Sequence, residues 1–131
     1  MLFMNSWRAM ALAIAVLAQP TPAASDAWVA EPAAGATTAA AYVTVSNPTM
    51  YDIYIDSASS DAAGKIELRE GAASAKTLTV PSYGSLEMKP GGSSLMLADL
   101  KHALKAGEKV NLTIQTDGGI KLNIAAEIRK P

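Results

Sequence analysis

The feature that most constrains the fold is a series of short segments in which apolar and polar residues alternate, separated by clusters of Gly, Pro, Asn, Asp and Ser. Alternation with a period of two places successive side chains on opposite faces of a β-strand. Residues 39–46 show this pattern, with Val43 and Val45 on one face and Tyr42 and Thr44 on the other. Many short strands at this spacing are typical of a sandwich or barrel, so the sequence predicts an all-β domain.

The turns between these segments have recognisable chemistry. Residues 90–92, Pro-Gly-Gly, predict a tight turn, and the Asp-Gly pair within 116–119 predicts a hairpin between the last two strands. Residues 98–107 place Leu100 and Leu104 four positions apart, which fits either one helical turn or an irregular loop with two buried leucines. The predicted strands lie at residues 39–46, 51–57, 65–70, 77–80, 85–88, 94–97, 110–115 and 120–128.

The N-terminus has the composition of a secretory signal. Arg8 precedes an apolar stretch at residues 9–18, and Ala-Ala-Ser at residues 23–25 offers small residues for cleavage. A retained membrane anchor is the less favoured alternative, because an apolar run of about ten residues is too short for a hydrocarbon core of roughly 30 Å. We therefore expect residues 1–25 to be a signal peptide, and residues 26–131 to form one periplasmic domain that does not span the membrane after cleavage.

Composition excludes several classes of function. The sequence has no cysteine, so disulfides and thiolate metal sites are excluded. Its 11 basic and 12 acidic residues are nearly balanced and form no basic tract, so no nucleic-acid partner is expected. The single histidine, His102, lies in the predicted 98–107 loop, where a solvated side chain is the simplest interpretation. Without a nucleophile and base at a supported spacing, we expect no enzyme activity and no catalytic residues.

Several segments resemble a known family across nearly the whole chain after the signal. They comprise residues 26–32, 40–48, 66–70, 86–97 and 99–101, including the sequences Ile-Glu-Leu-Arg-Glu and Lys-Pro-Gly-Gly-Ser-Ser-Leu-Met-Leu. These segments resemble the periplasmic copper chaperones of the PCu(A)C (DUF461-like) family. The resemblance implies a cupredoxin-like Greek-key β-sandwich. It also implies that residues 98–107, which precede the last hairpin, form a loop.

The same resemblance locates a copper site whose ligands are mostly replaced. The family carries a histidine in the segment that corresponds to residues 66–70, and the position here is Arg69. It carries a His-x-Met motif in the segment that corresponds to residues 89–97, and the positions here are Ser94 and Met96. A further family methionine has no counterpart in residues 71–80. A guanidinium stays protonated and repels a cation, and a hydroxyl is a poor donor to a soft metal. We therefore expect a degenerate site with no tightly bound cofactor and at most weakly bound copper.

Methionine offers an alternative route to copper, because thioethers suit Cu(I). Met96 occupies the one retained ligand position, and Met88 and Met50 lie elsewhere without matching a family ligand position. Met96 with Met88 is the main weak Cu(I) candidate pair. The favoured interpretation of Met96 is packing in the sandwich core or at its rim.

These observations lead to a functional hypothesis with two rivals. The chain is expected to be a copper-chaperone-like accessory protein of copper homeostasis or cuproenzyme assembly, whose partner is a periplasmic or membrane copper protein. An association with methane oxidisers is implied by the resemblance alone. The rivals are a weak Cu(I) carrier that uses thioethers, and a metal-free protein-interaction module that uses the sandwich surface or an open sheet edge.

Overall fold

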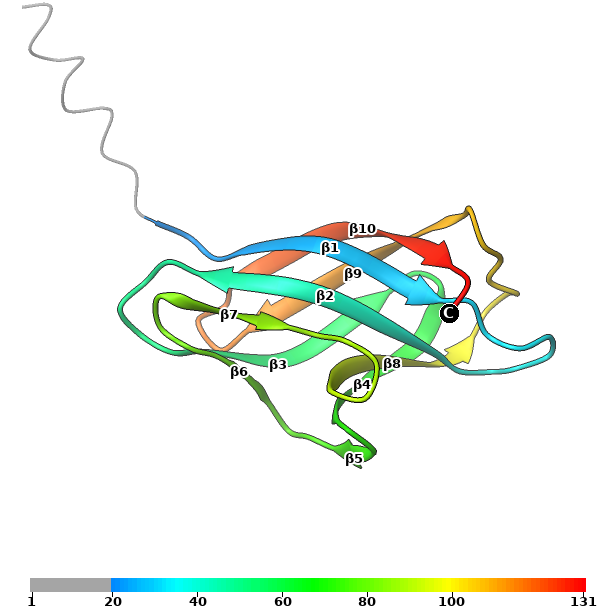
Figure 1. The fold of residues 1–131 in the computed structure, drawn as a ribbon, viewed down its shortest axis with the longest axis horizontal. Coiled ribbons are helices and arrows are strands. Elements are labelled where there is room, and N and C mark those ends of the chain that lie inside the picture. The colour runs from blue at the N-terminus through cyan, green and yellow to red at the C-terminus, as the bar shows by residue number, and fades with distance from the viewer. Residues whose placement is uncertain (1–19) are drawn as a thin grey trace, which may run out of the picture.

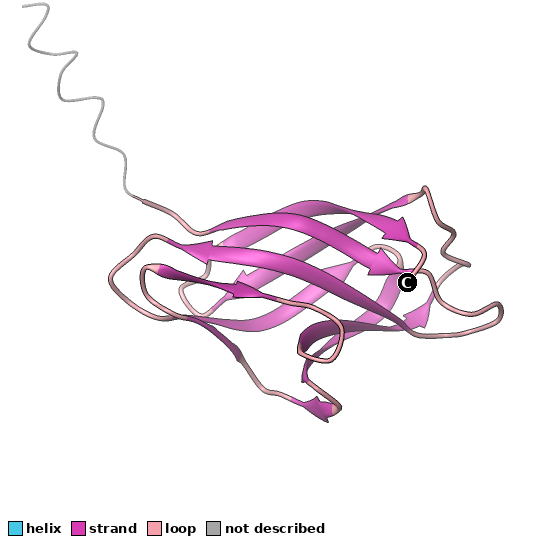
Figure 2. Ribbon diagram, in the orientation of Figure 1, coloured by secondary structure: helices cyan, strands magenta, loops and turns pink. Residues whose placement is uncertain are grey.

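The computed structural model describes residues 20–131, which form ten β-strands joined by turns and loops, with no helix in that range (Figures 1 and 2). The strands are β1 (Ala23–Ala30), β2 (Ala39–Asn47), β3 (Ile53–Ser60), β4 (Ala63–Glu70), β5 (Ala73–Ser74), β6 (Leu78–Val80), β7 (Gly84–Glu87), β8 (Ser93–Leu100), β9 (Lys109–Thr116) and β10 (Lys121–Arg129). No helix within the described residues is long and apolar enough to cross a bilayer. The all-β prediction is confirmed.

The strands form one hydrogen-bonded ladder in the order β5-β4-β8-β2-β1-β10-β9-β3-β6, and β7 adds to β2. Every pairing is antiparallel except that of β1 with β10, which is parallel. The ladder wraps around a common interior, and β3 packs beside β4 across the corner made by their connecting turn (Figure 1). This arrangement is the predicted Greek-key β-sandwich.

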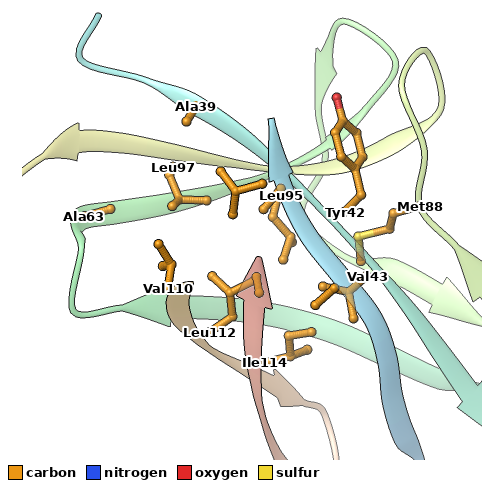
Figure 3. Close-up of a cluster of buried hydrophobic side chains, with 14 of the residues drawn as sticks. Ala39, Tyr42, Val43, Ala63, Met88, Leu95, Leu97, Val110, Leu112 and Ile114 are labelled. Atoms are coloured by element: carbon orange, nitrogen blue, oxygen red, sulfur yellow. The ribbon is translucent and has the colours of Figure 1, made fainter. Parts of the chain in front are cut away.

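The core lies between the two layers and consists mainly of β-branched and leucine side chains (Figure 3). Those that are at most 1% exposed include Val29, Val43, Val45, Ile55, Leu78, Leu95, Leu97, Leu112, Ile114 and Ile128. Burying one such side chain is worth roughly 1.5–3 kcal/mol. Because the chain has no disulfide, this apolar burial and the strand ladder stabilise the domain.

The predicted Pro-Gly-Gly turn has the expected form, whereas the 98–107 connection is a loop only after residue 100, and of its two leucines only Leu104 is buried. Gly91 has a φ of 84°, and the amide of Gly92 donates to the carbonyl of Lys89 at 2.9 Å. β8 continues to Leu100, beyond the predicted end at residue 97, and a loop follows. Leu104 in this loop is 3% exposed, so the loop with a buried leucine is the observed alternative.

Two strands were not predicted, and the first of them crosses the expected domain boundary. β1 begins at Ala23, so three of its residues belong to the predicted signal peptide. Its register with β2 shifts between Ser25 and Trp28, and Asp26 adopts a φ of 49° in this bulge. The other unpredicted strand, β5, has two residues. The cleavage position stays a prediction, and residues 1–19 lie outside the described range.

Candidate functional site

The three positions that the motif singled out lie together on two neighbouring strands. Arg69 on β4 is directly opposite Ser94 on β8, and Glu67 is directly opposite Met96. Since side chains alternate along a strand, these four residues share one face. Their neighbours Leu68 and Leu95 point the other way and are 5% and 0% exposed. The candidate site is therefore a cross-strand cluster on the face of the β4–β8 pair opposite the core.

Burial differs among the members of this cluster. Ser94 is only 7% exposed, whereas the side chains of Arg69 and Glu67 are 31% and 37% exposed. Met96 is half-buried, although Leu95 and Leu97 on either side of it are fully buried in the core. Met96 thus lies at the rim, on the face that the core does not use. A thioether there remains within reach of solvent.

Arg69 contacts two oxygen atoms, one of Glu67 on its own strand and one of Ala72 in the turn after β4. Its Nε lies 3.1 Å from Glu67 Oε1, and Nη1 donates to the carbonyl of Ala72 at 3.5 Å. Ser74 on β5 is opposite Arg69 on the side away from Ser94. Nε has no hydrogen-bond partner of good geometry among residues 20–131, so the contact with Glu67 is a charge–charge contact.

The carboxylate of Glu67 completes this arrangement. Ser74 Oγ donates to Glu67 Oε1 at 2.5 Å. The Ser74 hydroxyl, and after it the Arg69 guanidinium, lowers the pKa of Glu67 below its ordinary value, because both favour the charged carboxylate. Arg69 and Glu67 are two residues apart on β4 and so lie on the same face of the strand. Ser74 was missed, because its two-residue strand has no alternating pattern to reveal it.

The donor atoms of this cluster do not suit copper. Met96 supplies one soft thioether, Ser94 and Ser74 supply hard neutral hydroxyls, and the carboxylate of Glu67 already faces a permanent cation. Within the described residues there is no group of three or more His, Cys, Asp or Glu side chains that would hold a metal ion. The motif positions therefore present one soft donor atom, the Met96 sulfur, beside a permanent cation.

The remaining candidate donors lie in other surroundings. Met88 is 3% exposed and belongs to the core cluster, with its amide donating to the carbonyl of Val43 at 3.2 Å (Figure 3). Met50 is 62% exposed in the β2–β3 loop. His102 is exposed in the β8–β9 loop, and its Nδ1 lies 3.1 Å from the carbonyl oxygen of Ala103. The motif positions converge, whereas these three residues are dispersed.

Comparison with known proteins assigns the family. The family described as "Putative lipoprotein LpqE-like" matches residues 23–128, from the first residue of β1 to the penultimate residue of β10. The chain belongs to this family. A protein of Leifsonia xyli subsp. xyli (strain CTCB07) named "Putative lipoprotein Lxx21020" is 32% identical over 114 residues, which cover 80% of this chain and 68% of that protein.

Solved structures place the LpqE-like chain among PCuAC domains. A copper-bound PCuAC domain from PmoF2 matches with a TM-score of 0.78 at 22% identity, over 88% of this chain and 97% of that domain. The solution structure of Cu(I)-bound DR1885 from Deinococcus radiodurans matches with a TM-score of 0.67 at 30% identity, over 92% of this chain and 86% of that one. The predicted resemblance to PCu(A)C proteins and the cupredoxin-like fold are both confirmed.

Proposed function

We propose that this chain is an exported, non-enzymatic, copper-chaperone-like accessory protein of copper homeostasis or cuproenzyme assembly, and that its own site does not hold copper tightly. Family membership and the PCuAC fold support the chaperone-like role. The absence of tight copper binding is inferred from Arg69, which occupies the position where the family resemblance places an imidazole. Arg69 contacts Glu67 and is paired with Ser74 on one side and Ser94 on the other.

The charge of Arg69 opposes copper independently of the missing donors. A guanidinium remains protonated at every relevant pH. Two unit charges about 4 Å apart repel by roughly 1 kcal/mol at the dielectric constant of water and about 4 kcal/mol at an effective value of 20. Because Arg69 is 31% exposed, the lower part of this range applies. Displacing the side chain would also break its contact with Glu67.

Export to the periplasm fits this role. The proposed signal peptide at residues 1–25 directs the chain to the periplasm. The matched relative is named a lipoprotein. This name and the proposed signal peptide both favour export, and we propose a periplasmic location.

Copper retention on the purified exported protein tests the proposed site. After incubation with excess Cu(I) or Cu(II) and desalting, we expect far less than one copper per chain by elemental analysis. If Met96 alone binds Cu(I) weakly, a chelator of modest affinity will remove the metal and the result still agrees with the proposal. Near-stoichiometric copper that resists such a chelator would contradict it.

One end of the sandwich is suited to contact with a copper protein. Large side chains in loops there are solvent-exposed, with Tyr51 and Tyr83 at 72% and Met50 at 62%. The amide of Tyr83 donates to the carbonyl of Thr49 at 3.0 Å, so the β2–β3 and β6–β7 loops lie side by side. Tyrosine and methionine are enriched at protein interfaces. We assign this end to an exported copper-protein partner.

The loops at this end are rigidly built around one buried amide. Asn47 is 1% exposed. Its Nδ2 donates to the carbonyls of Tyr51 at 2.7 Å and Val80 at 3.1 Å, while its Oδ1 accepts from both the amide and the hydroxyl of Thr49. All four hydrogen-bonding positions of the amide are used. A surface ordered before binding loses less entropy when a partner docks.

Site-directed photo-crosslinking in the periplasm tests the partner surface. A crosslinking residue at Tyr51 or Tyr83 should form an adduct with a copper protein, identified by mass spectrometry, whether or not copper is supplied. The control position is Asn111, which is exposed on β9. Equal adducts from Asn111, or adducts at the tyrosines that contain no copper protein, would refute the assignment.

A further inference from the structure

A cleft lies between the β1–β2 and β8–β9 loops, separate from the Arg69 cluster. It has a volume of about 750 Å³, within the range of small-molecule sites. Residues 32–36 form one wall, and residues 102–106 form the other. Figure 1 shows these loops extending beyond the strands near the chain's C-terminus. Leu104, at 3% exposure, lines the cleft where it meets the core.

Hydrogen bonds hold the two walls together. Glu31 Oε2 accepts from the amide of Ala106 at 2.6 Å and so joins the first loop to the second. The amide of Leu100 donates to the carbonyl of Thr37 at 3.1 Å and makes a second link. These bonds fix the two walls relative to each other, and a cleft held in this way loses less entropy when a molecule enters.

The walls and the rim of the cleft differ in chemistry. The walls expose small apolar side chains, among them Ala33, Ala34 and Ala103. Lys105 and Lys130, which are exposed and which we take as the rim, also line the cleft, and within residues 20–131 neither forms an ion pair. With Glu31 as the only acidic residue of the lining, two positive charges and one negative charge leave the cleft with a net charge of +1 when His102 is neutral.

We propose that this cleft binds an amphipathic monocarboxylate, such as a medium-chain fatty acid. The apolar chain lies against the alanine walls and Leu104. The carboxylate lies at the rim between Lys105 and Lys130, because its negative charge complements their positive charges. Nothing in this proposal depends on the copper-related function, since no residue of the cleft belongs to the Arg69 cluster.

Titration of the purified protein with decanoate, below the concentration at which micelles form, tests this site. We expect saturable binding by calorimetry, and in ¹⁵N spectra amide shifts concentrated at residues 31–36 and 102–106. Decyltrimethylammonium has the same chain with a cationic head and should bind at least tenfold more weakly. Equal binding of the two probes, or shifts spread over other loops, would overturn the proposal.

Charge variants isolate the role of the lysines. The double variant Lys105→Met with Lys130→Met keeps two long side chains without their charges and should weaken decanoate binding at least tenfold. The matched control is Lys76→Met with Lys89→Met, since both lysines are exposed and outside the cleft. Ala103→Trp should fill the cleft and reduce binding. Unchanged affinity in the Lys105 and Lys130 double variant would overturn the proposal even if Ala103→Trp fails to fold.

Discussion

At the scale of single residues, Arg69 and Ser94 carry the proposal that the site does not hold copper tightly. They face each other across β4 and β8, and Met96 lies two residues further along the same face. The backbone therefore still presents the three motif positions together. What differs is the chemistry of two side chains, and that difference can be reversed by substitution.

The double variant Arg69→His with Ser94→His should raise copper affinity by several orders of magnitude. It places two imidazoles beside Met96 and removes a permanent cation, and each added ligand acts on strands already in register. Competition with a chelator of known affinity measures the gain. The control Arg69→Gln removes the charge without adding a donor and should gain little. A folded double variant with no gain would show that the loop at residues 71–77 has altered the geometry of the site.

The sequence anticipated the site in part, and the physical reasons are visible residue by residue. Ser94 and Met96 are two apart on one strand, so their common face followed from the period of two. The pairing of Arg69 with Glu67 agrees with the same period, because Glu67 lies two residues away on the same face and Glu70 on the opposite one. Ser74 reaches Glu67 only because β5 folds back on β4. The rim position of Met96 was equally open, since an apolar run has no alternation from which to assign a face.

At the scale of elements, eight of the ten described strands were predicted, and β1 and β5 were missed. β2, β9 and β10 differ from their predicted limits by at most a few residues. β1 was missed, because Ala, Ser and Asp dominate its first half and have low strand propensity. Its pairing with β2 on one side and β10 on the other overrides that propensity. The cleft likewise depends on tertiary structure, since its walls come from loops about 70 residues apart.

The start of β1 provides a prediction about the mature N-terminus. Ala23, Ala24 and Ser25 pair with Ser46, Val45 and Thr44, and Ser46 Oγ donates to the carbonyl of Ala23 at 3.3 Å. A chain that begins at Asp26 loses these contacts. Compared with a chain that begins at Pro22, it should be less stable by about 1–3 kcal/mol, since each hydrogen bond contributes roughly 0.5–1.5 kcal/mol.

Urea unfolding followed by Trp28 fluorescence measures this difference. The control is a chain that begins at Pro20, which adds only exposed residues before Pro22 and should change stability by less than about 0.5 kcal/mol. Equal midpoints for the chains that begin at Pro22 and Asp26 would show that the first three residues of β1 contribute nothing. The mass of the exported protein then shows whether cleavage retains them.

At the scale of the whole molecule, one hydrophobic core serves both layers of the sandwich. The Arg69 cluster, the tyrosine-bearing end and the cleft occupy different parts of the surface. We therefore expect a substitution at one of them to leave the structure of the other two unchanged. Sequence alone predicted the scaffold and the motif positions. The two loop surfaces could not be predicted, because they are formed by loops that are far apart in the sequence and that the strand order brings together.

The parallel pairing of β1 with β10 has a consequence for the timing of folding. Trp28 and Glu127, which pair in this ladder, are 99 positions apart in the sequence. Closing so long a loop carries an entropic cost, and topologies rich in distant contacts fold slowly. β1 has no partner on its β10 side until the last strand has been synthesised. The sheet of a nascent chain with this topology therefore cannot be completed before β10 is synthesised, and such a delay fits the proposed export, because secretion channels admit unfolded chains.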